Sequence, residues 1–185
     1  MNQQLISDLV LAVKSRYMGR YRALVVDTND STERGRLQVQ VPAVLDELTV
    51  WAMPSSPYAG DQVGLYTMPP AGSGVWVEFE GGDPSYPVWA GAFWADGQLP
   101  DDSTEGVKVL KTNSLTVRLD DDEKEILVNA DDNAEVIISD RVSQTVGGVS
   151  QLVDSNGVVS DSGGTGKIEV TSSGVNVDNG ALEVT

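Results

Sequence analysis

The sequence contains neither cysteine nor histidine. Without cysteine the chain has no disulfide framework and no thiolate metal site, and without histidine it lacks the commonest general base and the commonest transition-metal ligand. Three acidic groups, Asp101–Asp102, Asp120–Asp122 and Asp131–Asp132, lack the ligand spacing and the glycine of a known calcium loop. Their acidity is typical of turns, so we expect neither a metal nor a cofactor.

Long apolar segments and positive charge are also scarce. The N-terminal run LVLAV is short and follows Asp8, and no uninterrupted apolar segment approaches the roughly 20 residues that cross a bilayer. The chain carries 28 acidic against 12 basic residues, a formal net charge of -16 that repels the phosphate backbone of nucleic acids. We therefore expect a protein that is assembled in the cytoplasm and has no nucleic-acid partner.

Aromatic residues are absent after Trp94, and every Met and Pro lies at or before Pro100. The acidic excess is larger in the C-terminal part. From Ala95 onward there are 18 acidic and 6 basic residues, and before Ala95 there are 10 acidic and 6 basic residues. Two segments of such different composition predict two structural units, joined by the linker-like sequence ADGQLPDDSTEG. We predict an N-terminal helix at 1–17, a barrel at 18–95, a linker at 96–106 and a C-terminal shaft at 107–185.

The first residues have the periodicity of an amphipathic helix. Leu5, Leu9 and Val13 recur at helical spacing, and Ile6 and Val10 widen the apolar stripe. Such a stripe has two interpretations. It packs on its own domain, or it is a docking handle for a neighbouring hub subunit.

From residue 20 onward the pattern is that of β-strands. Five alternating or β-branched runs, YRALVVDT, GRLQVQVP, LTVWAMPSS, GVWVEFE and YPVWAGAFW, are separated by polar, Gly-rich or Pro-rich turns. Five antiparallel strands in so short a segment predict a small closed barrel, because closure removes the exposed sheet edges. We expect the Trp and Phe side chains to supply its core.

In the C-terminal half, the segments SLTVRLD, EILVNAD and AEVIISD alternate apolar with polar residues, as half-buried strands do. Near the end of the chain the alternation becomes a repeat. In KIEVTSS, GVNVDNG and ALEVT, equivalent apolar residues are seven positions apart with internal spacings of two and five, which indicates a strand and a turn rather than a coiled coil. The apolar residues of the repeat are Ile168, Val170, Val175, Val177, Leu182 and Val184. Without aromatics they favour a thin core shared between chains, in an oligomeric β-helix or intertwined fibre. The alternative is a flexible acidic tail in which the alternation is accidental.

Residues 18–91 resemble a known family. YRALVVDTNDSTERGRLQVQVP, WAMPSSPYAG and PPAGSGVWVEFEGGDPSYPVWAG are similar to the oligonucleotide/oligosaccharide-binding (OB) barrel of the phage baseplate assembly protein V family. This family includes the central spikes of contractile phage tails, of type VI secretion systems (valine-glycine repeat protein G) and of extracellular contractile injection particles. The resemblance implies an all-β homotrimer: a short helix, a five-stranded OB-fold barrel, and C-terminal segments wound into an intertwined triple-stranded β-helix.

The function that the resemblance implies is structural. The spike would sit at the end of the inner tube, bind tube or hub proteins through its barrel end, and pierce the target envelope in a transient contact. The segment between Trp94 and Val107 is too short for the lysozyme domain of some phage spikes, and a chain without histidine cannot bind iron at its tip as others do. We expect a Pro-Ala-Ala-Arg (PAAR) repeat tip protein to contact the terminal strand, at Ala181, Leu182, Glu183, Val184 and Thr185.

Two other functions are open to this sequence. Glu78, Glu80 and Asp83 form a possible carboxylate set for glycoside hydrolysis, but Glu78 and Glu80 are expected on one face of a strand, which is typical of the solvated side of a barrel. We therefore expect no catalytic residues and no enzyme. The alternative to a spike is a monomeric OB-fold module for oligosaccharide or nucleic acid with an acidic tail, for which the sequence offers stacking aromatics but no basic groove.

Overall fold

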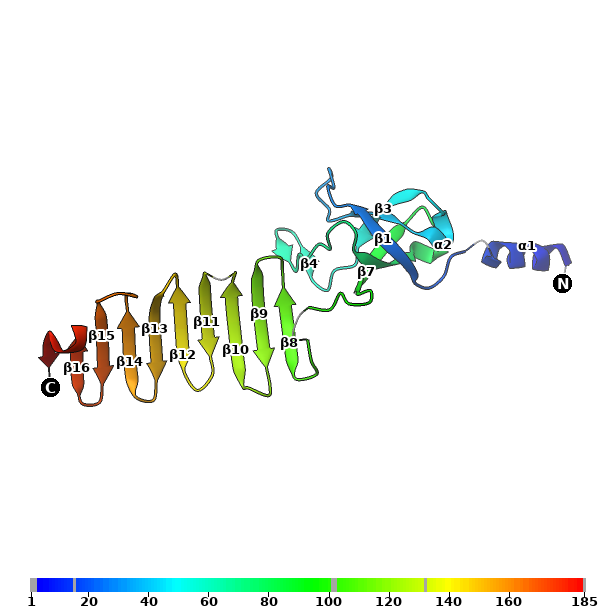
Figure 1. Cartoon of the computed structure of the whole chain (residues 1–185). Coiled ribbons are helices and arrows are strands. Elements are labelled where there is room, and N and C mark those ends of the chain that lie inside the picture. The colour runs from blue at the N-terminus through cyan, green and yellow to red at the C-terminus, as the bar shows by residue number, and fades with distance from the viewer. Residues whose placement is uncertain (1–2, 15, 101–102, 132, 185) are drawn as a thin grey trace. The chain divides into compact units, whose positions relative to one another are not determined.

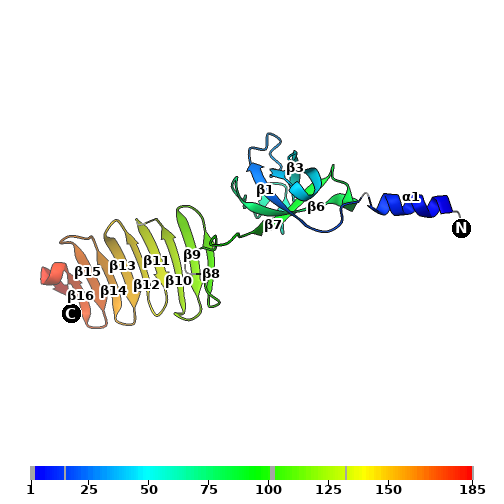
Figure 2. The same ribbon diagram turned by 45° about the vertical axis from the view of Figure 1, so that its right-hand side comes forward.

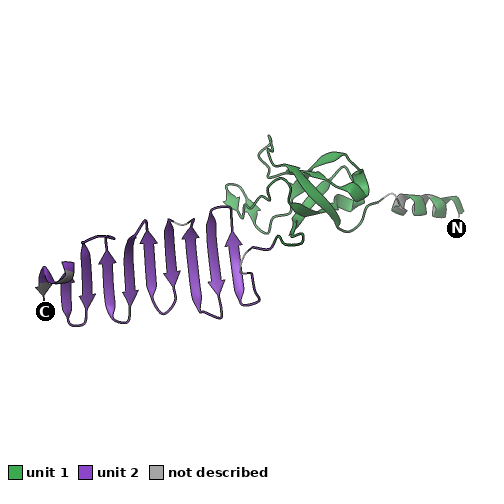
Figure 3. Ribbon diagram, viewed as in Figure 1, with its two compact units in different colours: residues 1–98 green, residues 99–185 purple. Residues whose placement is uncertain are grey.

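The computed structural model describes residues 3–14, 16–100, 103–131 and 133–184. The chain divides into two compact units, residues 1–98 and residues 99–185, which Figure 3 shows in green and purple. Within the described segments, no helix is long and apolar enough to cross a membrane.

The first unit contains a short helix and a closed barrel. Its elements are α1 (Gln3–Lys14), β1 (Tyr21–Asp27), β2 (Leu37–Gln40), α2 (Pro42–Leu45), β3 (Thr49–Pro54), β4 (Ala59–Gly60), β5 (Val63–Gly64), β6 (Gly74–Phe79), the 3-10 turn η1 (Glu80–Gly82) and β7 (Pro87–Phe93). The barrel has the strand order β1-β2-β3-β7-β6, and β4 and β5 form a separate two-stranded hairpin. All five predicted barrel strands are present, and the predicted mostly-β class with a short helix is confirmed.

One strand pair of the barrel is not antiparallel as predicted. β3 and β7 run parallel, with Met53 opposite Val88 and Pro54 opposite Trp89. The cause is the long connection that follows β3: it leads to β6, which pairs with β1, and β7 then returns beside β6 and meets β3 in the same direction. This parallel pair closes the barrel.

The barrel core consists mainly of small aliphatic side chains rather than of the aromatics. Its buried hydrophobic residues are Ala23, Val25, Leu37, Val39, Val41, Ala52, Val75, Val77, Phe79 and Trp89. The expectation that Trp and Phe fill the core is thus correct for Phe79 and Trp89 only. In β6 the alternation points Val75, Val77 and Phe79 inward and therefore Trp76 outward, where it packs against Phe93 with ring centroids 5.1 Å apart.

The second unit is one sheet in which the strands follow chain order (Figures 1 and 2). Its elements are β8 (Val107–Lys111), β9 (Leu115–Asp120), β10 (Glu125–Ala130), β11 (Ala134–Ile138), β12 (Val142–Val146), β13 (Val149–Asp154), β14 (Gly157–Asp161), β15 (Lys167–Thr171), β16 (Gly174–Val177), the 3-10 turn η2 (Asp178–Gly180) and β17 (Leu182–Val184). This 10-stranded sheet is antiparallel throughout.

The strands of the second unit pair in sequence order within the chain. Each strand pairs with its neighbours in the same chain, so the chain makes its own backbone ladder. Acidic turn residues favour these local hairpins: Asp154 accepts hydrogen bonds from the backbone N–H of Asn156 at 2.7 Å and of Gly157 at 3.2 Å. Winding of several chains around one another stays a prediction, and their assembly depends on how the sheet faces are covered.

Candidate functional site

The sheet of the second unit has two chemically different faces. Residues directly opposite each other in an antiparallel pair point to the same face, so the register defines both faces. One face, here called the apolar face, carries Leu110, Leu115, Val117, Leu119, Ile126, Val128, Ala130, Ala134, Val136, Ile138, Val142, Val146, Val149, Val153, Val158, Ile168, Val170, Val175, Val177 and Leu182. Lys108, Gln144, Gln151 and Ser160 lie in the same rows, and no described acidic residue does.

The apolar face is exposed in the single chain. Leu110 is 64% exposed, Val146 62% and Ile168 48%. All described hydrophobic residues that are buried lie in the barrel, between Ala23 and Trp89, and the only described residue buried in the second unit is Asp120. The sheet thus has no hydrophobic core of its own. An apolar surface of this extent is typical of an interaction site.

The opposite face is mixed: it carries paired charges beside a half-buried aliphatic row of Val109, Leu127, Ile137, Leu152 and Val159. Asp120 accepts hydrogen bonds from the backbone N–H groups of Glu123 and Asp122, each at 3.0 Å, and from the Arg118 guanidinium at 2.5 Å. These bonds hold the pKa of Asp120 below its usual range, the Glu123 N–H contributing most. Farther along, the Glu169 carboxylate lies 2.5 Å from Lys167 Nζ and raises the pKa of that lysine. The charged residues of this face are suited to contact with water.

The structure brings the six predicted shaft-core residues into adjacent rows of the apolar face. Ile168 lies opposite Val177 and Val170 lies opposite Val175, while Leu182 lies opposite Val177 in the next strand pair. Val184 occupies the register position opposite Val175. The seven-residue repeat is therefore an antiparallel hairpin repeat that returns apolar residues to one face at every strand. Their role in a core between chains stays a prediction.

Two other predicted contact sites fall only partly within the described residues. Of the predicted tip-protein contact, Ala181 and Leu182 are exposed, Glu183 and Val184 belong to β17, and Thr185 lies outside the described residues. Of the predicted hub-docking residues, the side chains of Leu5 and Leu9 are not described.

The described part of the helix stripe is exposed. Val13 is 65% exposed, and the side chains of Ile6 and Val10 are exposed as well. No described residue of α1 joins the hydrophobic cluster of the barrel. For Ile6, Val10 and Val13, packing on the barrel is therefore not seen, while docking of the stripe on a hub subunit stays a prediction.

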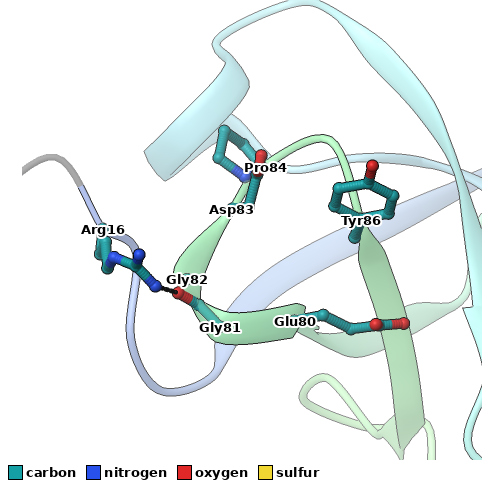
Figure 4. A pocket seen from close by; sticks show the side chains of 7 residues that line it. All are labelled: Arg16, Glu80, Gly81, Gly82, Asp83, Pro84 and Tyr86. Carbon is teal, nitrogen blue, oxygen red and sulfur yellow. Dashed lines mark hydrogen bonds between the residues drawn. The ribbon is translucent and has the colours of Figure 1, made fainter.

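The GGDP turn after β6 anchors the segment that follows α1. Arg16 Nη1 donates to the carbonyl oxygen of Gly81 at 2.6 Å, and the backbone N–H of Tyr17 donates to that of Gly82 at 2.9 Å. Figure 4 shows the Arg16 side chain directed at this turn. The Tyr17 ring packs 6.1 Å from Phe79, measured between ring centroids. The turn thus fixes the start of the barrel at Arg16 and Tyr17.

A pocket of about 560 Å³ lies over this turn and is lined by Arg16, Glu80, Asp83, Pro84 and Tyr86 with the two glycines. The carboxylate of Glu80 points away from Arg16 (Figure 4). Asp83 accepts a hydrogen bond from the Ser85 N–H at 2.9 Å, which lowers the pKa of this aspartate. Asp83 thus has a local role in closing the turn.

The suspected carboxylate set does not share one strand face. β6 ends at Phe79, so Glu80 lies in the 3-10 turn, contrary to the prediction that it alternates with Glu78 along the strand. Glu78 is paired with Arg20 at 2.7 Å. Among the residues that the structure describes, no acidic side chains converge as the ligands of a metal ion would, while Asp101, Asp102 and Asp132 lie outside them.

Sequence reasoning missed four strands of the apolar face. It identified β9, β10, β11 and the last repeats but not strands β8, β12, β13 and β14. A signal was present: the tripeptide Val-Ser-Gln occurs at 142–144 and again at 149–151, seven residues later, as in the C-terminal repeat. The glutamines interrupt the aliphatic alternation and so concealed these two strands.

Comparison with known proteins identifies the barrel. Residues 21–94 match the model of a family described as the type VI secretion system/phage-baseplate injector OB domain. No curated protein matches the chain.

Proposed function

Because residues 21–94 belong to the family of type VI secretion system/phage-baseplate injector OB domains, we propose that this protein is the central spike of a contractile tail or injection system. The family implies a spike-like structural role in a virion or secretion apparatus, and it is not known as an enzyme family. In our proposal three chains form a needle at the end of the inner tube that pierces the target envelope. The number three follows from the resemblance of the barrel to trimeric spikes.

The observation that supports association of the chains is the exposed apolar face without acidic residues. A chain with net charge -16 repels its copies wherever acidic residues meet. The apolar face avoids this repulsion, whereas the opposite face would bring Asp120, Glu125 and Glu169 of several copies together. Three copies that turn their apolar faces inward bury the aliphatic residues and leave the acidic residues in water.

The competing function, a monomeric binding module, is disfavoured by the same observation. In a monomer the apolar face stays in water along ten strands, and such a surface promotes aggregation. Assembly removes this liability. The barrel end would then bind inner tube or hub proteins, and the β17 end would bind a PAAR-like tip protein. The contact with the target envelope would be transient.

The test is the solution mass of the full-length protein, measured by light scattering. We expect about three times the 19.7 kDa of one chain. Val146→Asp places a carboxylate on the apolar face, where an unpaired buried charge costs on the order of several kcal/mol, so this variant should lose the trimer. Thr145→Asp is the matched control, since Thr145 is the exposed neighbour on the opposite face. A monomeric parent, or equal masses of the two variants, would exclude the shared core.

A further inference from the structure

The apolar face contains one amide pair, in the middle of the sheet. Gln144 in β12 lies directly opposite Gln151 in β13, and Gln144 Nε2 donates to Gln151 Oε1 at 2.6 Å. Ser160 lies opposite Gln151 in the next strand. Between Leu110 and Leu182 these are the only polar residues among the described members of this face.

The amide pair keeps hydrogen-bonding capacity that its own chain does not use. Among the described residues, neither the side-chain oxygen of Gln144 nor the side-chain amino group of Gln151 has a partner in the same chain. The first is an acceptor and the second a donor. A buried amide without a partner destabilises a core, whereas amides of other copies at the same level can supply the missing bonds.

The surface around the pair leaves room for such contacts. A hollow of about 730 Å³ lies over this part of the sheet, and its lining includes Gln144, Gln151, Ser160, Ile168 and Val177. The small Ser160 side chain lies beside Gln151, where a larger residue would fill the space. Amide groups from other copies can therefore approach the pair.

The remainder of the face gives little information about alignment. Rows of Val, Ile and Leu recur at every strand, and a copy displaced by two strands, roughly 10 Å, would again place aliphatic residues against aliphatic residues. The same displacement would move Gln144 and Gln151 onto Val128 and Val136 in one direction, and onto Ser160 and Ile168 in the other. In both directions at least one glutamine meets an aliphatic residue and its polar groups stay unpaired. A single polar layer in a repetitive core is a known means of specifying register at a cost in stability.

We propose that Gln144 and Gln151 form an amide layer that sets the register of the copies in the shaft. The inference rests on the proposed function, because it requires copies of this chain on the apolar face. Between copies, the layer excludes displaced assemblies that the aliphatic rows alone permit. Gln144 and Gln151 are thus specificity-determining residues for self-association.

The stability test uses four full-length proteins: the parent, Gln144→Leu, Gln151→Leu and the double variant. Each single variant leaves one buried amide without its partner and should lower the midpoint of thermal unfolding of the trimer. The double variant removes both amides and should recover the parental midpoint or exceed it. Thr145→Val with Ser150→Val is the matched control, since these residues are directly opposite in the same two strands but on the other face.

The register test uses disulfide formation between copies. The chain has no cysteine, so Val128→Cys and Val170→Cys can be introduced singly on the apolar face, in the parent and in the double-leucine protein. In a single register the introduced thiols of different copies lie at the same level and form disulfides. In a mixture of registers the thiols lie at different levels and do not form disulfides. We therefore expect less cross-linked product in the double-leucine protein than in the parent, and an unchanged amount in the Thr145/Ser150 control. If the double variant does not fold, the amount of cross-linked product in each single variant is compared with that in the parent.

The outcomes separate the two proposals. A trimeric parent whose cross-linking is unchanged by the glutamine substitutions, or single variants that unfold like the control, would overturn the amide layer and leave the spike intact. A monomeric parent, or a parent that cross-links at neither position, would overturn the shared core and the proposed function with it.

Discussion

Arg36 donates from Nε and Nη2 to Oδ1 of Asp30, at 3.0 and 2.7 Å. The Asp30 side chain is only 4% exposed and also accepts backbone N–H bonds from Thr32 and Arg34, at 3.0 and 2.9 Å. The Arg36 bonds, together with those from Thr32 and Arg34, hold the pKa of Asp30 far below its ordinary value. One carboxylate thus organises the loop between β1 and β2, which the sequence identified only as a polar turn.

Asp30→Asn is expected to lower the thermal midpoint of the barrel at pH 7, followed by the fluorescence of its Trp residues. The stabilisation by Asp30 is complete above the pKa of the unfolded chain, about 4, and is lost as the pH falls toward the lower folded value. The difference between parent and variant should therefore shrink below about pH 4. Asp61→Asn, at an exposed residue, is the control. A difference in thermal midpoint between parent and variant that grows as the pH falls would contradict this account.

Gly82 is expected to be essential for anchoring the N-terminal segment. Its φ is +80°, and an added Cβ would lie 2.8 Å from Arg16 Cβ and 3.1 Å from the Tyr17 nitrogen. Gly97 has a φ of +75° with no atom within 4 Å of an added Cβ, so Gly97→Ala measures backbone strain alone. Gly82→Ala should lower the free energy of unfolding by about 1–3 kcal/mol more than Gly97→Ala does, because it adds overpacking to that strain. Urea unfolding measures both variants, and equal losses would show that the contact with Arg16 and Tyr17 does not matter.

The fold was predictable where the decisive pattern was local. The alternation of GVWVEF indicates which residues of β6 face inward, and the spacing of Ile168 and Val170 indicates which residues share a strand face. Neither pattern specifies the partner strand. The parallel contact of Met53 with Val88 joins residues far apart in the sequence, and the closure of the barrel decides it.

The candidate site was predictable only in part, at β9 to β11 and at its C-terminal end, for a related reason. At Gln144 and Gln151 the apolar alternation is broken, so periodicity gave no strand, although the ladder continues through both residues. Trp76 was expected in the core by its size, but the inward positions of β6 belong to its neighbours Val75 and Val77. Side-chain size and hydrophobicity predict burial less well than position on the strand.

The acidic charge predicts a salt dependence of the assembly. Three chains carry a formal charge of -48, three times -16, so their mutual repulsion is strongest at low ionic strength. Raising the salt from about 0.01 to 0.5 M shortens the screening length and should raise the thermal midpoint of the trimer. Scanning calorimetry at constant pH measures the effect. A midpoint that falls with salt would mean that ion pairs such as Arg118 with Asp120 outweigh the repulsion.

The exposed stripe of α1 predicts a separation between assembly and docking. Val10 and Val13 are exposed, and no described residue of α1 contributes to the barrel core. Replacing both valines by Glu should therefore leave the number of chains in the assembly unchanged. It should abolish binding to the inner tube or hub protein, because the carboxylates would have to be desolvated at that contact. Ser7→Glu, at an exposed residue of the same helix, is the control for added charge. Light scattering measures the mass, and co-sedimentation with assembled tubes measures docking. If the double substitution dissociates the protein instead, the stripe packs between copies of this chain and not against the hub.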